Sequence, residues 1–217
     1  MDRKRILEQT EETVRRRTAG ESTGHDWWHA VRVRHLALRI AREEQADEFV
    51  VQLAALLHDL GDFKFHGGDE SEAPRQARQW LEEQGVEEGV IAQVCEIVAG
   101  VSFKGAGVPT PMRSIEGQAV QDADRLDALG AIGVARAFAF GGNRGRELHN
   151  PERPAEPHAT FEQYKQTQGP TINHFYEKLL LLKDRMNTQT GRRLAEARHQ
   201  FMEDFLDRFF QEWDGKA

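Results

Sequence analysis

The sequence has little of what several protein classes require. It contains a single cysteine, Cys95, which excludes an internal disulfide framework and a four-cysteine zinc site. No apolar run approaches about 18 residues, so we expect no membrane span. The first residues, MDRKRILEQTEE, are charged and have no apolar core, so they do not form a secretory signal. These absences favour a cytoplasmic protein that folds around an ordinary hydrophobic core.

The sequence also contains fewer basic than acidic residues. Lys and Arg number 29 against 36 Asp and Glu, which gives a net charge of −7. That balance argues against a protein that follows the backbone of a nucleic-acid polymer. A nucleotide substrate is still compatible with it, because one local basic pocket would be enough. The 217 residues suffice to bury a sizeable core without disulfides.

The apolar residues repeat with helical spacing, and no segment of useful length alternates as a strand does. The run FVVQLAALLHDL (49–60) is apolar on most sides, which predicts a helix in the centre of the core, with Asp47 as its N-cap. Residues 114–140 predict two closely packed helices or one kinked helix. Further helices are expected over 28–46, 74–84, 87–101, 161–168, 170–187 and 190–213. We therefore predict one all-α domain over residues 1–217, a helical bundle with additional C-terminal helices.

In the last predicted helix, Phe201, Phe205 and Phe209 recur at helical spacing. An apolar stripe of this kind packs into the core or forms a dimer face. A homodimer is therefore one arrangement that we consider.

Three short segments carry residue types that bind metals. His25 and His29 in HDWWH are four residues apart, so they share one face of a helix. His58 and Asp59 end the most apolar helix, and QDADRLDAL places three aspartates in another. An unpaired carboxylate is costly to bury, and a metal ion would relieve that cost. Imidazole nitrogen and carboxylate oxygen suit one divalent ion, Mn²⁺ by preference, with Mg²⁺, Co²⁺, Zn²⁺, Fe²⁺ or Ni²⁺ as alternatives.

The order of the segments HDWWHAVRV, LAALLHDLGD and DADRLDALG resembles the H…HD…D signature of the HD superfamily of metal-dependent phosphohydrolases. Together with the loop GGNRGRELHNP, the pattern is similar to the small, stand-alone bacterial members. The resemblance implies a metal-binding core over about 24–130, a substrate loop over about 141–158 and C-terminal helices to 217. By position, it implies the metal ligands His29, His58, Asp59 and Asp124. Asp122 and Asp127 compete with Asp124 for the last place.

Such a site would use a divalent ion to acidify a water molecule and to polarise a phosphoryl oxygen. Catalytic roles are then expected for Asp59, for His25 and Asp26, which could orient His29 or shuttle protons, and for Glu72 as a general base. Groups that could bind substrate phosphate or a substrate hydroxyl are Arg32, Lys64, His66, Arg125, Asp127, Arg144 and Arg146.

The activity that this set favours is hydrolysis of a (d)NTP to a (d)NMP and pyrophosphate by metal-activated water. The reason is that the set contains more basic residues than a single phosphate group would need. A nucleotidase, a cyclic-nucleotide phosphodiesterase and a (p)ppGpp hydrolase are alternatives within the same superfamily. A non-catalytic module that senses nucleotides, or a di-iron oxygenase, would be alternatives of another class. The chain lacks a G-Y-P tripeptide, which disfavours the signalling HD-GYP subgroup.

Overall fold

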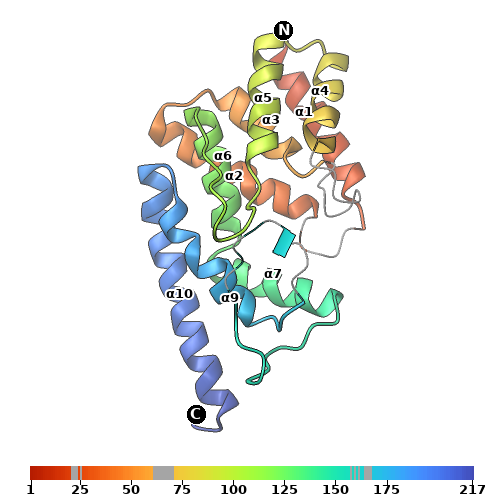
Figure 1. The fold of residues 1–217 in the computed structure, drawn as a ribbon. Helices are drawn as coiled ribbons and strands as arrows, with labels where there is room; N and C mark the ends of the chain where they lie inside the picture. Colours follow the sequence, from red (N-terminus) through yellow and green to blue (C-terminus); the bar gives the residue numbers. More distant parts are fainter. Residues whose placement is uncertain are drawn as a thin grey trace. The chain divides into compact units, whose positions relative to one another are not determined.

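The computed structural model describes residues 1–20, 24, 26–60, 71–156, 158, 160, 162–163 and 168–217. Every regular element within these ranges is a helix, as predicted (Figure 1). None of the described helices is both long enough and apolar enough to cross a membrane. The chain divides into two compact units, one of residues 1–103 and 109–124 and one of residues 104–108 and 125–217. A single domain over residues 1–217 stays a prediction.

The N-terminal unit is organised around the apolar helix that the sequence predicts. Helix α3 packs against α1, α2 and α5, and Leu53, Ala54 and Leu57 are fully buried. The Asp47 side chain accepts hydrogen bonds from the main-chain N–H groups of Phe49 and Val50, so it caps α3 as predicted. The helices of this unit are α1 (Arg3–Arg17), α2 (Trp27–Glu44), α3 (Glu48–Leu57), α4 (Glu72–Glu83), α5 (Glu88–Gly100) and α6 (Ile115–Asp127), the last up to Asp124.

The first helix, α1, is not among the predicted elements. Its sequence is strongly charged, and only a few of its side chains, among them Ile6 and Val14, are buried. Such a narrow apolar stripe is a weak indication of a helix in the sequence. Packing of α1 against α3 buries this stripe and stabilises the helix.

The C-terminal unit contains α7 (Gly130–Asn143), α9 (Asn173–Glu177), the 3-10 helices η1 (Leu179–Leu181) and η2 (Lys183–Arg185), and α10 (Gln189–Trp213). Of the two alternatives for residues 114–140, two helices is the correct one. Gly130 separates them with φ +71°, a conformation that favours glycine. Gly133 allows the first turn of α7 to lie close to the Ala128 main chain, because a Cβ at position 133 would lie 2.2 Å from the Ala128 carbonyl oxygen.

The prediction of one helix over 170–187 is wrong. Helix α9 ends at Glu177, Lys178 leaves the helical conformation with φ −142°, and η1 and η2 follow. Tertiary contacts hold this segment: the Arg185 guanidinium donates to the main-chain carbonyls of Gly105, Ala106 and Val108. Contacts so distant in sequence leave no mark on local periodicity. The short helix predicted over 161–168 falls mostly outside the described residues.

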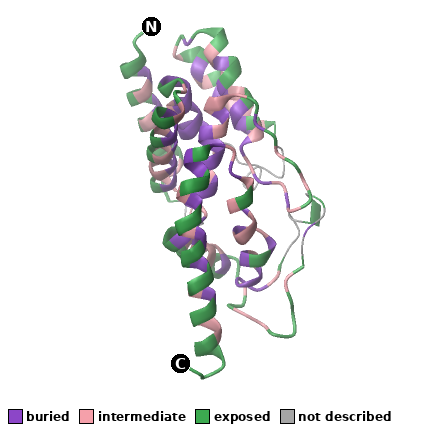
Figure 2. Cartoon of the chain, turned by 90° about the vertical axis from the view of Figure 1, so that its left-hand side faces the viewer, coloured by how far each residue is buried: buried purple, intermediate pink, exposed green. Residues whose placement is uncertain are grey.

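Along α10, buried and exposed residues alternate with helical spacing (Figure 2). The buried face consists of Ala195, His199, Met202 and Leu206, rather than the predicted phenylalanine stripe. Phe201 is 46% exposed, whereas Phe205 and Phe209 are half-buried. These two rings extend an aromatic cluster in which Phe205 stacks on Phe175, with ring centroids 5.8 Å apart. A dimer face stays a prediction.

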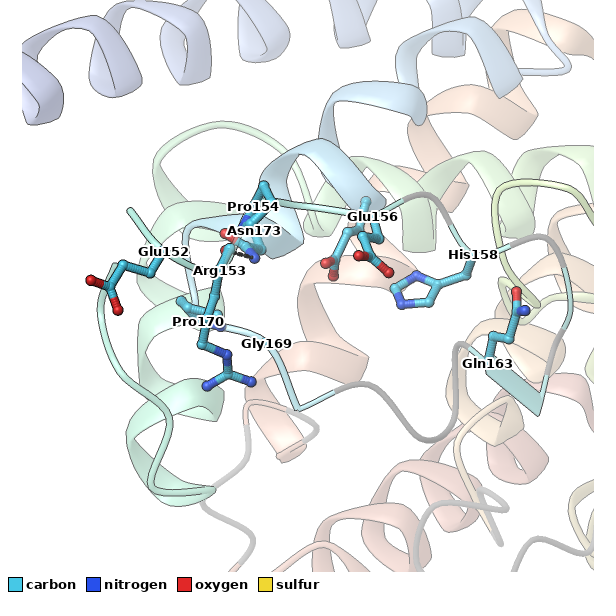
Figure 3. Close-up of a pocket in the computed structure, with 10 residues that line it drawn as sticks. Glu152, Arg153, Pro154, Glu156, His158, Gln163, Gly169, Pro170 and Asn173 are labelled. Atoms are coloured by element: carbon cyan, nitrogen blue, oxygen red, sulfur yellow. Dashed lines mark hydrogen bonds between the residues drawn. The ribbon is translucent and has the colours of Figure 1, made fainter. Parts of the chain in front are cut away.

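The same unit contains a pocket of about 600 Å³ (Figure 3). Its walls come from the loop that follows α7, from Gly169 and Pro170, and from helix α9.

Candidate metal centre

Helix α2 begins in a way that fixes its first turn. Asp26 is the N-cap, and its Oδ1 accepts a hydrogen bond of 2.9 Å from the main-chain N–H of His29. An N-cap carboxylate satisfies an N–H group that the helix itself leaves without a partner. This contact sets the position of His29, whose side chain is almost completely buried.

His58 is the C-cap of α3, and its ring is oriented by the backbone. The Nδ1 atom lies 2.8 Å from the carbonyl oxygen of Ala55. Because a carbonyl only accepts, Nδ1 carries the hydrogen and Nε2 of the neutral ring presents a lone pair. That lone pair faces Nε2 of His29 at 3.2 Å. A backbone bond of this kind is the usual way in which a metal-binding histidine is oriented.

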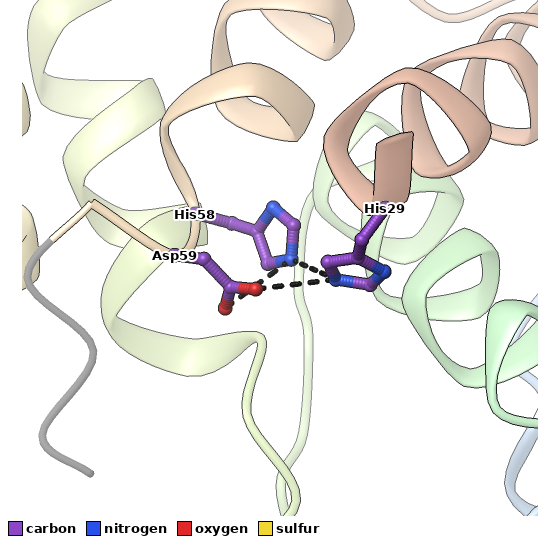
Figure 4. Close-up of side chains that lie close together, drawn as sticks. All are labelled: His29, His58 and Asp59. Atoms are coloured by element: carbon purple, nitrogen blue, oxygen red, sulfur yellow. Dashed lines mark hydrogen bonds and ion pairs between the residues drawn. The ribbon is translucent and has the colours of Figure 1, made fainter. Parts of the chain in front are cut away.

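Two carboxylates complete the cluster. The Asp59 oxygens lie 3.2 Å from His29 Nε2 and 3.4 Å from His58 Nε2 (Figure 4). Asp124 Oδ1, from α6, lies 3.6 and 3.8 Å from the same two nitrogens. Donors bound at about 2.1 Å to one ion lie roughly 3.0–3.4 Å from each other. The His29, His58 and Asp59 donors therefore fit a single divalent ion, and Asp124 lies slightly farther out.

Of the described residues, His29, His58 and Asp59 are the group of His, Cys, Asp and Glu side chains close enough together to hold a metal ion. The four residues assigned through the sequence resemblance are thus brought together in the N-terminal unit. Asp122, the competing choice from α6, is fully buried. It is Asp124 whose oxygen approaches both histidines.

An all-helical unit in which a His-Asp pair ends a buried helix and meets a histidine and an aspartate from other helices defines an HD-type metal-dependent hydrolase. The HD domain family model matches residues 27–129, a range that includes all four candidate ligands. The chain belongs to the HD superfamily of hydrolases.

Its relatives agree with this assignment over nearly the whole chain. YpgQ, an uncharacterized protein of Bacillus subtilis (strain 168), is 44% identical over 192 residues, which cover 86% of this chain and 83% of YpgQ. A crystal structure from Lactobacillus plantarum has a TM-score of 0.87 and 37% identity, covering 96% of this chain and 97% of that one. An HD-superfamily hydrolase of Bacillus thuringiensis has a TM-score of 0.75 and 40% identity, covering 98% of both chains. The crystal structure of YpgQ in complex with ADP has a TM-score of 0.75 and 36% identity, covering 97% of this chain and 100% of the chain in that crystal structure.

Five other residues of the N-terminal unit are predicted from the sequence to act in the site. Arg32 is three residues after His29 on α2, which puts both on one helix face. Glu72 begins α4, and its carboxylate accepts hydrogen bonds from Arg75 at 3.0 Å and from Gln76 at 2.6 Å. His25, Lys64 and His66 lie outside the described residues. The functions predicted for these five residues stay predictions.

In the C-terminal unit, Arg125 and Asp127 are engaged in internal contacts. Arg125 is buried, and its Nη1 donates to the main-chain carbonyl of Arg185. Asp127 is buried and forms an ion pair of 2.8 Å with Arg136. Sequence reasoning missed Arg136, because nothing in the local pattern of α7 distinguishes it from a surface arginine. Contacts of this kind stabilise the fold, and substrate binding by Arg125 and Asp127 stays a prediction.

Arg144 and Arg146 follow the end of α7. Their guanidinium groups lie 5.5 and 5.4 Å from the centroid of the Phe140 ring, within the range of a cation–π contact. Substrate binding by this pair also stays a prediction.

Proposed function

We propose that this protein is a metal-dependent phosphohydrolase that acts on nucleotides, and that it hydrolyses a (d)NTP to a (d)NMP and pyrophosphate. The observation that carries the proposal is that Nε2 of His29 and Nε2 of His58 lie 3.2 Å apart, and that Asp59 and Asp124 each bring carboxylate oxygens within 3.2–3.8 Å of these two nitrogens. The ADP bound in the crystal structure of YpgQ supports a nucleotide as the ligand class.

A divalent ion held there would lower the pKa of a water molecule and offset phosphate charge. The protein residues supply the rest. His29 and His58 would bind the ion as neutral imidazoles, while Asp59 and Asp124 balance its charge. In the net reaction, water adds across the anhydride between the α- and β-phosphates. Its oxygen becomes part of the (d)NMP, and pyrophosphate leaves. Arg32, three residues after His29 on α2, would bind phosphate oxygens.

Product analysis tests the proposal. Metal-stripped protein would be given Mn²⁺, Mg²⁺, Co²⁺ or Zn²⁺ in turn, with a panel of NTPs, dNTPs, monophosphates and cyclic nucleotides. Products would be resolved by chromatography and phosphorus NMR. We expect metal-dependent release of pyrophosphate from triphosphates. In ¹⁸O-labelled water, the label should appear in the monophosphate and not in pyrophosphate.

Other outcomes assign another function. Orthophosphate from monophosphates would indicate a nucleotidase, and ring opening of a cyclic nucleotide would indicate a phosphodiesterase. Nucleotide binding without any product would indicate a sensing module.

A further inference from the structure

The pocket in Figure 3 lies entirely within the C-terminal unit, whereas the four candidate metal ligands belong to the N-terminal unit. Its volume of about 600 Å³ is in the range that holds small molecules, about 300–1,000 Å³. Its walls are tied together: Asn173 Nδ2 donates to the Arg153 carbonyl at 2.8 Å, and Arg153 Nη2 donates to the Gln168 carbonyl at 3.2 Å. These bonds link helix α9 with both segments of the loop.

Among the described residues that line it, the pocket has three glutamates and one arginine, and one of the glutamates is buried. Glu177, the last residue of α9, is 5% exposed, and burial raises the pKa of its carboxyl group. Within the described part of the chain, no lysine or arginine forms an ion pair with it; its partners are the main-chain N–H of Glu156 and the more distant charges of His158 and Arg146. A buried carboxylate with no cation in direct contact is costly.

The remaining charged groups on the walls increase the imbalance. Glu152 and Glu156 add two carboxylates, while Arg153, the one arginine among the described lining residues, already pairs with Glu147 at 3.3 Å. The buried imidazole of His158 and the carboxylate of Glu156 point into the same space. The described lining of the pocket therefore presents several hydrogen-bond acceptors and more acidic than basic groups.

A metal ion does not suit this arrangement. Among the described residues, His158, Glu156 and Glu177 do not form a group close enough to hold one ion, unlike His29, His58 and Asp59. Acceptors spread over a larger volume suit a cation that carries several N–H donors at a distance from each other, as guanidinium and ammonium groups on a short chain do.

We propose that this pocket binds a small organic cation of the guanidinium or primary-amine class, with the Glu177 carboxylate as its counter-ion. This second ligand site does not depend on the proposed hydrolytic activity, and binding is measured without any turnover.

The test is calorimetric or NMR titration of the full-length protein with methylguanidinium, agmatine and putrescine. Methylurea, which has nearly the same shape as methylguanidinium but no charge, is the matched neutral ligand. We expect saturable binding of the cations and none of methylurea. The near-isosteric Glu177→Gln should weaken binding by about tenfold or more. The control Glu212→Gln, on the exposed end of α10, should leave binding unchanged.

A second variant should fill the pocket while it keeps the Glu177 carboxyl group. A Cβ on Gly169 would lie 3.4 Å from Asn173 Nδ2 and 3.6 Å from Glu177 Oε1, so Gly169→Leu should fill the space and abolish binding. This variant decides the question if Glu177→Gln does not fold. The proposal is overturned if no cation binds saturably, if methylurea binds as well as methylguanidinium, or if folded variants at positions 177 and 169 bind as the natural protein does.

Discussion

Nε2 of His29 and Nε2 of His58 face each other across 3.2 Å. The ring hydrogen of His58 is already donated from Nδ1 to the Ala55 carbonyl, so in the neutral ring its Nε2 has only a lone pair to offer. The 3.2 Å gap can be bridged by a hydrogen that neutral His29 donates from its Nε2, or by a cation that both nitrogens bind. A divalent ion at this point would be held by both imidazoles in their neutral form.

Asp124 is the candidate ligand that has competitors, because Asp122 and Asp127 are close to it in sequence. We expect Asp124→Asn to lower metal affinity by more than the roughly 10–100-fold that loss of an outer contact costs, and to abolish turnover. Metal content and calorimetric affinity would measure this. Asp204→Asn, an exposed change on α10, is the control. Unchanged metal binding in Asp124→Asn would shift the assignment to Asp122.

Asp26 should act on the metal site through the backbone. Asp26→Ala removes the cap of α2, which should cost about 1 kcal/mol of stability and weaken metal binding by up to about tenfold. Asp26→Ser keeps a capping oxygen and should restore both. The control is Asp2→Ala, which removes the cap of α1, where Asp2 accepts from Arg5 N at 3.1 Å. That change should affect denaturant unfolding alone; equal losses of metal affinity in both alanine variants would contradict the positioning role.

The sequence predicts the helices that carry His29 and His58 well, because the determinants of these helices are local. The set of four metal ligands rests on the resemblance and stays a prediction. The His-Asp pair ends a helix whose apolar character is obvious over ten residues, and Asp26, three residues before His29, is a typical cap. What it could not predict depends on distant contacts. The sequence predicts an α-helix that continues through residues 178–185. In the structure this segment forms two 3-10 helices, and Arg185 donates hydrogen bonds to carbonyl groups about 80 positions upstream. The acidic pocket likewise combines segments whose separate sequences look like surface loop.

The Asp127–Arg136 pair predicts a large effect of a single substitution. Arg136→Met would leave the Asp127 carboxylate buried without its guanidinium partner, which should cost about 3–5 kcal/mol in the free energy of unfolding. Urea denaturation would measure it. The double variant Asp127→Asn/Arg136→Met should recover most of the loss; if it is as unstable as Arg136→Met, the pair does not account for the effect.

Glu177 should impose a pH dependence on stability. Burial raises the pKa of its carboxyl group above the ordinary value of 4.5, so the folded chain holds this proton more tightly than the unfolded chain does. Its contribution to stability is therefore greatest below pH 4.5 and is lost as the pH rises through the raised folded pKa. Relative to the natural protein, Glu177→Gln should become increasingly stable across this window, as thermal unfolding would show. A difference that does not change with pH would contradict the shift.

The guanidinium of Arg185 binds carbonyl groups at positions 105, 106 and 108, in a stretch that the chain visits before it returns to the N-terminal unit at Pro109. The C-terminal unit thus consists of two separate segments of the chain. A fragment expressed from Arg125 onward would lack three acceptors for Arg185, and a fragment ending at Phe103 would lack all of α6 and with it Asp124. No single cut in the coding sequence yields two self-sufficient halves, so dissecting the protein calls for a permuted or grafted chain rather than a truncation.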